Sequence, residues 1–294
     1  MSMSWFKKLF TPEKIESQQA TQPSEDLKAQ QGNGFAAGTL VHTDQGLVPI
    51  EQLQVGDNVL SRAADGSGEV IYKAITQIII TKNAFVGFIH LSVAVDNTLP
   101  IMERIRLQRI VDSQEPTRFL VTKSHSFFVP QKGWFEVGEI SWRNNFVDKD
   151  GILYCAESGN DPYGDGVLSK IYKTNQSNIG FMPNSGDDNP AHYGSLIDLT
   201  TGKEIENSVS YRPVVSKLYE HNNEWKQRLK EQIPEDQRKH AEFHGFRQGH
   251  WVDPETVQWG EGEGPVTLTV YNLEVADTHT YYVGHTGIWV RAAD

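Results

Sequence analysis

The sequence has a single cysteine, Cys155, among 294 residues. One thiol excludes an intramolecular disulfide and a zinc site built from four cysteines. Cys155 follows the apolar run ILY, so we expect a buried free thiol. No apolar run approaches the roughly 18 residues that span a membrane, and the start, MSMSWFKKLF, lacks the core of a secretory signal. We therefore expect a protein that is cytoplasmic or that is exported by a route independent of a signal peptide.

Basic residues are also scarce relative to acidic ones, and the formal net charge is −11 at pH 7. Such a chain repels the phosphate backbone of nucleic acids unless a local basic patch overrides the repulsion, and the sequence contains no such patch of useful length. We expect neither nucleic acid nor a membrane as a partner. No motif indicates a cofactor.

Composition divides the chain into regions. Residues 11–33 are rich in Gln, Glu, Ser and Pro, which predicts that residues 1–33 form a disordered leader. Short apolar runs broken by turn residues then predict an all-β body, with a helical turn at Ile50–Leu53 after Pro49. The strands predicted there are Thr39–His42, Asn58–Ser61, Val70–Thr81, Phe85–Val95, Ile105–Val111, Arg118–Thr122 and Ser126–Val129.

Residues 150–265 change character again and predict an α+β insertion. Ser216–Ile233 and Asp236–His244 have a helical period and are divided by Pro234. Strands are predicted to return after the insertion. The resulting domain division is a leader (1–33), a body in two parts (34–149 and 266–294) and the insertion, with the last strands at Val266–Val275, Thr280–Val283 and Gly287–Val290.

Three segments carry a family resemblance. Residues 34–62 read GFAAGTLVHTDQGLVPIEQLQVGDNVLSR, residues 118–140 read RFLVTKSHSFFVPQKGWFEVGEI, and residues 266–290 read VTLTVYNLEVADTHTYYVGHTGIWV. In this order they resemble the conserved blocks of Hint domains, the hedgehog and intein family, and most of all the type found in bacterial polymorphic toxins. The resemblance implies a mainly β Hint fold with an α+β insertion. It also implies self-cleavage or protein splicing, with the two ends of the body meeting at one pocket.

The resemblance also assigns chemistry to individual positions. In active members a Cys or Ser side chain attacks the preceding carbonyl, a Thr and a His act on the scissile peptide, and a final His-Asn pair releases the chain. Here glycine replaces the nucleophile, arginine cannot shuttle a proton near neutral pH, and alanine cannot cyclise. The matching residues are Gly34 at the nucleophile position, Thr122, His125, His279, Arg291 at the penultimate His position and Ala292 at the terminal Asn position.

Two origins fit these losses: natural decay, which Arg291 favours, or deliberate substitution to trap a precursor. If the remaining site is preorganised, Gly34→Cys should restore thiol-induced release of the first 33 residues. Each histidine also has a purely structural interpretation, with His125 a buried core residue and His279 a turn residue.

The sequence therefore predicts a Hint-like autoprocessing domain that is inactive for splicing. The alternative is a non-catalytic interaction module of a bacterial toxin or secretion system, which binds another protein through its leader or insertion. An active enzyme would need an unorthodox nucleophile, or a metal held by His240 and His244, which lie four residues apart on a predicted helix. Exposed helix histidines are commoner, so no metal site is predicted.

Overall fold

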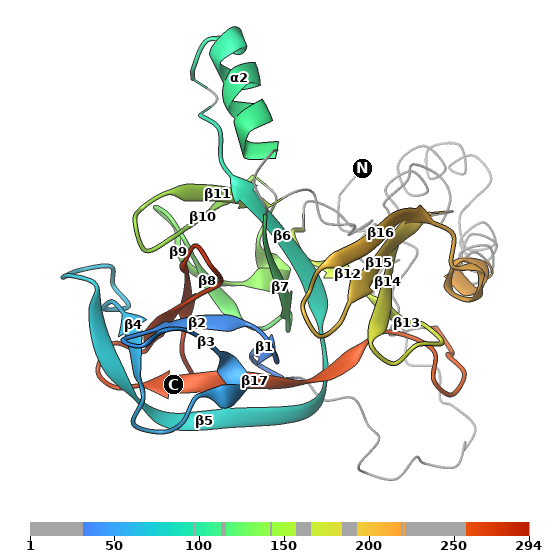
Figure 1. The fold of residues 1–294 in the computed structure, drawn as a ribbon, viewed down its shortest axis with the longest axis horizontal. Helices are drawn as coiled ribbons and strands as arrows, with labels where there is room; N and C mark the ends of the chain where they lie inside the picture. Colours follow the sequence, from blue (N-terminus) through green and yellow to red (C-terminus); the bar gives the residue numbers. More distant parts are fainter. Residues whose placement is uncertain are drawn as a thin grey trace, which may run out of the picture.

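Strands dominate the computed structural model, which describes residues 32–96, 98–112, 116–141, 143–156, 166–183, 193–218, 220 and 257–293. They form one 15-stranded sheet and one 4-stranded sheet (Figure 1). The predicted mainly β class is confirmed. Most of the predicted leader lies outside the described residues. No helix among the described residues is long and apolar enough to cross a membrane.

The elements before the predicted insertion alternate short strands with tight turns. The strands predicted at Asn58–Ser61 and Ser126–Val129 have these bounds in the structure. In chain order the elements are β1 (Phe35–Ala36), β2 (Leu40–Thr43), β3 (Gly46–Pro49), η2 (Ile50–Gln52), β4 (Asn58–Ser61), β5 (Ile71–Phe85), β6 (Gly87–Val93), α2 (Ile101–Asp112), β7 (Thr117–Val121), β8 (Ser126–Val129), β9 (Gly133–Glu136), η3 (Val137–Glu139) and β10 (Asn145–Val147).

The remaining strands include a separate small sheet. Its order is β13-β14-β15-β16, and residues 212–218 follow it as a helical segment. The first predicted insertion helix is therefore described only as far as residue 218, apart from residue 220, and the second lies outside the described residues. The strands are β11 (Leu153–Ala156), β12 (Ser169–Lys170), β13 (Tyr172–Lys173), β14 (Ile179–Pro183), β15 (Gly194–Asp198), β16 (Glu204–Val209), β17 (Thr267–Val275), β18 (Thr280–Val283) and β19 (Ile288–Arg291).

A long two-stranded ribbon forms the base of the large sheet. β5 pairs antiparallel with β17 over most of its length, and the two run side by side in Figure 1. The segment ITQIIIT is rich in β-branched residues, which pack well on a pleated surface. The ribbon connects the first block of the sequence to the last, because β4 pairs with one end of β5.

The two-residue strand β1 lies between β7 and β17. Phe35 pairs with Tyr271 on one side and with Val121 on the other. Its ring is fully buried in the core, where it meets Phe119 with the ring centroids 5.5 Å apart. The start of the body is thus anchored in the middle of the sheet.

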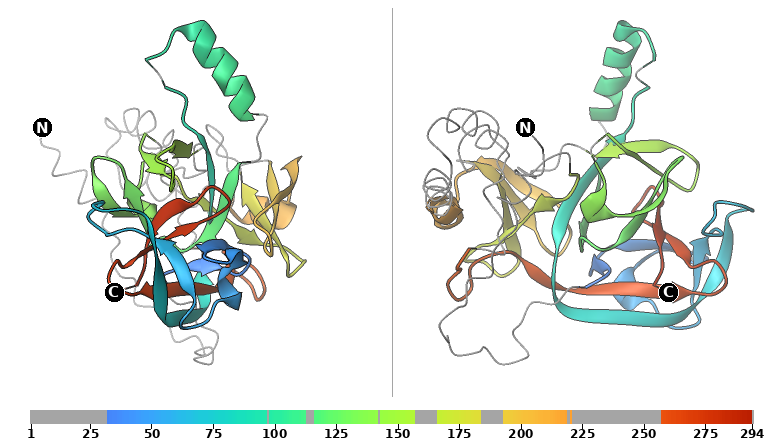
Figure 2. Two further views of the ribbon diagram at one scale, coloured as in Figure 1. Left: turned by 60° about the vertical axis from the view of Figure 1, so that its left-hand side comes forward. Right: turned by 180° about the vertical axis from the view of Figure 1, so that it is seen from behind.

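The strand predicted at Ile105–Val111 is wrong, because these residues lie in helix α2. A short apolar run cannot separate a buried strand from a helix by periodicity alone. Met, Glu, Arg, Leu and Gln fill the rest of IMERIRLQRIVD and favour a helix, and Pro100 precedes its first turn. The helix stands away from the sheets (Figure 2).

Cys155 differs in part from its prediction. It is a free cysteine on β11, as expected, but its side chain is half-buried rather than buried. Its thiol donates to the carbonyl oxygen of Ser92 at 3.7 Å on the neighbouring strand β6.

Candidate functional site

The turn between β7 and β8 forms hydrogen bonds with the segment that precedes β1. The N–H of Gly34 donates to Thr122 Oγ1 at 3.0 Å, and the N–H of Thr122 donates back to the Gly34 carbonyl oxygen at 3.0 Å. The hydroxyl of Ser124 donates to the carbonyl oxygen of Gly32 at 2.5 Å. We call the turn Thr122–His125, together with these contacts to residues 32–34, the clamp.

His125 completes the clamp. Its Nδ1 lies 2.8 Å from Asn33 Oδ1, an oxygen that can only accept, so Nδ1 carries the proton and donates. The N–H of His125 donates to the Thr122 carbonyl oxygen at 3.2 Å, which closes the turn. Three consecutive residues are therefore held by one short turn.

Burial keeps the imidazole neutral. His125 is fully buried, and desolvation lowers its pKa to about 3. Its ring packs edge-on against Phe35 with centroids 4.4 Å apart, and Phe127 and Tyr281 lie further out. Nε2 is buried and has no hydrogen-bond partner among the described residues. The side chain is a neutral donor to Asn33 and is placed by the aromatic core.

Gly34 occupies a position that accepts no side chain. Its φ is +155°, and a Cβ built on it would lie 2.3 Å from the Tyr271 carbonyl oxygen and 3.2 Å from the Asn272 nitrogen. These are backbone atoms of the paired strand β17, which cannot move aside as a flexible side chain would. The close approach of β1 to β17 therefore requires glycine.

Residues 291–293, which we call the C-terminal arm, also attach to β17. The N–H of Ala293 donates to the Leu273 carbonyl oxygen at 2.8 Å, and the N–H of Ala292 donates to the His279 carbonyl oxygen at 2.8 Å. Phe35, which follows residues 32–34 (the N-terminal arm), pairs with Tyr271, so the two arms reach this strand two residues apart. That spacing corresponds to about 7 Å along a strand.

The six predicted site positions fall into two groups. The clamp brings together Gly34, Thr122 and His125. His279 holds Ala292 through its backbone only: its side chain is exposed, and its φ of +54° marks the turn between β17 and β18. Arg291 pairs with Thr280 at the end of β19.

Sequence reasoning missed a buried polar pair beside the clamp. Tyr281 donates its hydroxyl to Asn272 Oδ1 at 3.0 Å, and both side chains are buried. Asn272 Nδ2 has no hydrogen-bond partner among the described residues. The ring of Tyr281 lies 6.3 Å from that of His125. A polar residue on a buried strand such as VYNLEV was the available signal, because such residues normally need a specific partner.

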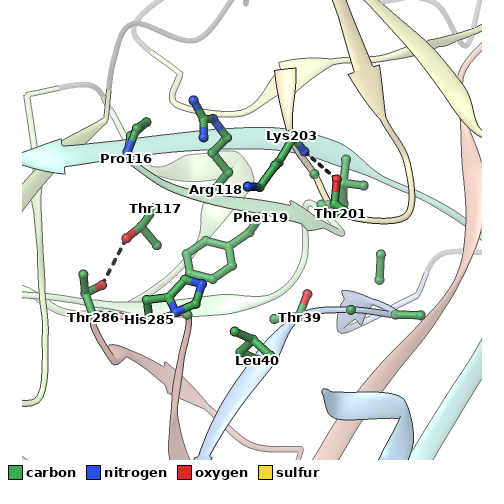
Figure 3. A pocket seen from close by; sticks show the side chains of 16 residues that line it. Thr39, Leu40, Pro116, Thr117, Arg118, Phe119, Thr201, Lys203, His285 and Thr286 are labelled. Atoms are coloured by element: carbon green, nitrogen blue, oxygen red, sulfur yellow. Dashed lines mark hydrogen bonds between the residues drawn. The ribbon is translucent and has the colours of Figure 1, made fainter. Parts of the chain in front are cut away.

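A pocket of about 330 Å³ lies between residues 36–40, β7 and the turns at residues 201–203 and 284–286 (Figure 3). One wall is Phe119, whose ring packs against Phe35. Arg118 from β7, Lys203 from the β15–β16 turn and His285 from the β18–β19 turn line it, together with several threonines. No acidic residue is among the lining residues, although the chain carries a net charge of −11.

No group of three or more His, Cys, Asp or Glu side chains that could hold a metal ion occurs in the described part of the chain. His240 and His244, the pair considered for a metal, lie outside the described residues. The buried histidine of the clamp has asparagine as its polar partner.

No protein-family model matches the chain, and no curated protein matches it. Among solved structures it is similar to a bacterial intein-like domain from Clostridium thermocellum, with 15% identity, 89% of this chain and 99% of that chain covered, and a TM-score of 0.40. A DnaB intein from Synechocystis sp. PCC 6803 has 9% identity, the same coverage and a TM-score of 0.38. The gp41-1 intein has 11% identity, 89% and 99% coverage, and a TM-score of 0.37. Such scores mark a distant likeness.

Proposed function

We propose that the chain is a Hint-like autoprocessing domain that keeps its grip on the peptide at residues 32–34 and has lost the chemistry of splicing. The clamp supports this proposal, since it holds both hydrogen-bonding groups of Gly34 and orients Asn33. The attachment of both arms to β17 supports it further. Such a domain binds its own peptide at residues 32–34 but does not form the thioester through which it would cleave that peptide.

The observation that carries the proposal is the absence of space at Gly34. The site lacks a nucleophile, and its backbone also leaves no room for one, because the added Cβ would meet a backbone oxygen at 2.3 Å. The expectation that Gly34→Cys would restore thiol-induced release is therefore reversed. A glycine that the strand pairing requires also favours natural decay over deliberate substitution.

The test is the intact mass of the purified full chain after incubation with and without dithiothreitol. For the wild-type chain and for Gly34→Cys we expect one full-length species under both conditions. Thiol-dependent release of the first 33 residues from Gly34→Cys would contradict the proposal. Circular dichroism of Gly34→Cys, compared with wild type, shows whether the variant folds. If Gly34→Cys does not fold, the wild-type result still tests the proposal.

We further propose that the domain acts beside another protein, a toxin or a delivery module, in the cytoplasm or after export by a route independent of a signal peptide. Support for this association comes from the resemblance of the three sequence blocks to the polymorphic-toxin type. Co-purification of the full chain with the products of neighbouring genes tests it. Recovery of the chain alone under mild conditions counts against it.

The second candidate function is that of a non-catalytic interaction module. The pocket lined by Phe119 favours this candidate. Its two cationic side chains and its threonine hydroxyls suit a carboxylate group, and its apolar wall suits a side chain beside that group. We propose an acidic peptide segment of a partner as its ligand. Titration with a short Glu-Phe peptide should show saturable binding that Lys203→Glu abolishes, whereas equal binding by the variant would exclude the pocket.

A further inference from the structure

We propose that Asn33 is a self-modification site, at which the clamp promotes attack of the Gly34 backbone nitrogen on the Asn33 side-chain amide and converts Asn33 into a succinimide and then into aspartate or isoaspartate. This inference rests on the clamp and is independent of the proposed loss of thioester chemistry. Asn33 is the only asparagine in the sequence that is followed by glycine. Glycine at position 34 places no side chain beside the nitrogen that would attack.

The clamp holds both reacting groups from one turn. Thr122 Oγ1 accepts the N–H of Gly34, the nucleophile, at 3.0 Å, and His125 Nδ1 holds Asn33 Oδ1, on the electrophile, at 2.8 Å. Ser124 fixes the preceding carbonyl of Gly32. Holding two reactants in one geometry replaces the search that a flexible peptide must make, and such preorganisation accelerates ring closure.

His125 acts on the group that accumulates charge. Attack on Asn33 Cγ places negative charge on Oδ1, and the buried ring of His125 already donates its Nδ1–H to that oxygen. A preorganised donor stabilises such charge without having to reorganise as the charge develops. Asn33 is itself exposed, so ammonia can leave and water can enter.

The step balances without an added reagent. A bond forms between Gly34 N and Asn33 Cγ, and the bond between Cγ and Nδ2 breaks. The Thr122 hydroxyl accepts the amide proton of Gly34 as it gives up its own proton, and Nδ2 takes up one proton and departs as ammonia, so that the protons balance. Water then opens the succinimide at either carbonyl, which gives aspartate or isoaspartate at position 33.

The same contacts disfavour chain cleavage at this bond. Cleavage would need Asn33 Nδ2 to attack its own backbone carbonyl. A hydrogen bond donated to Oδ1 draws electron density away from Nδ2 and weakens it as a nucleophile, while it makes Cγ a better electrophile. The geometry therefore selects loss of ammonia over release of the first 33 residues.

The experiment follows ammonia loss and isoaspartate at Asn33 by peptide mapping and mass spectrometry of the full chain at pH 7.4. A synthetic peptide spanning residues 28–39 serves as the unclamped reference. We expect the folded chain to react about tenfold or more faster than the peptide. Hydroxylamine should trap the succinimide by cutting the chain between Asn33 and Gly34. A slower reaction in the folded chain would overturn the proposal, because the clamp would then protect Asn33.

Variants distinguish a clamp that promotes modification of Asn33 from a clamp that protects Asn33 from it. His125→Phe and Thr122→Val should each slow the reaction toward the peptide rate, and Thr43→Val, which removes a buried hydroxyl from the β2–β3 hairpin, should leave it unchanged. Faster modification in His125→Phe or Thr122→Val would sink the idea. Spontaneous breakage between Asn33 and Gly34 without hydroxylamine would sink it equally. Neither readout depends on thiols, so failure here is distinct from failure of the proposed function.

Discussion

The N-terminal arm, residues 32–34, and the C-terminal arm, residues 291–293, lie beside the same strand, β17, and are held in place by different contacts. Side-chain groups of the clamp hold the N-terminal arm, and two of its contacts come from Thr122 and His125. The C-terminal arm is held by backbone hydrogen bonds to His279 and Leu273. Backbone contacts specify where a segment lies, whereas oriented side chains can also polarise it. Only the N-terminal arm therefore keeps groups that could act on a peptide.

The substitution that we expect to destabilise the attachment of the N-terminal arm most is Gly34→Ala. We expect a loss of about 4 kcal/mol of unfolding free energy, from a strained backbone and an overpacked contact with Tyr271. Urea denaturation measures it. The matched control is Gly46→Ala, since Gly46 also has a positive φ but no atom near its Cβ position. That control should lose only about 1 kcal/mol, and equal losses would remove the special status of Gly34.

The pH dependence of stability should come in part from His125. Its folded pKa is about 3, below the value of 6.5 for the free side chain, so the unfolded chain binds the extra proton between these values. Stability is complete above pH 6.5 and falls as the pH falls toward 3. The expected loss between pH 7 and pH 4 is about 3 kcal/mol.

Urea denaturation of wild type and His125→Phe at several pH values isolates this contribution, because the variant keeps an aromatic ring in the core but cannot titrate. As the pH falls, the free energy of unfolding of wild type should decrease relative to that of His125→Phe. Parallel curves would mean that His125 is not held neutral by burial.

The smallest of the three effects is expected from Thr122→Val. The N–H of Gly34 would lose its acceptor in a buried position, at a cost of about 2 kcal/mol. Thr122→Ser keeps the hydroxyl and should restore most of that stability in thermal and urea melts. If both variants match wild type, the hydroxyl does not hold the N-terminal arm.

The sequence was informative where local chemistry decides structure. Short apolar runs broken by turn residues predicted the bounds of β4, β8 and β18. In the structure the Thr and His of the second block lie beside residues 33 and 34. Helix α2 was mistaken for a strand because Ile105 and its apolar neighbours are ambiguous over so short a run, and only the helix-forming residues between them favour the alternative.

Two features of the site could not be predicted from the sequence. The requirement for glycine at position 34 arises from the distance to Tyr271, a partner known only once the strands are paired. The Asn272–Tyr281 pair likewise depends on which face of β17 is buried, and that face is set by register. Long-range pairing decided both features, and no local pattern reports it.

The short strand β1 imposes an order on assembly. Its residue Phe35 fits between β7 and β17, and its partner Tyr271 is synthesised near the far end of the described chain. A nascent chain on the ribosome can form the Thr122–His125 turn early, but it has no second edge for β1 until β17 emerges. Closure of the sheet is therefore a late event, and until then the ring of Phe35 lacks part of the packing that buries it in the folded core.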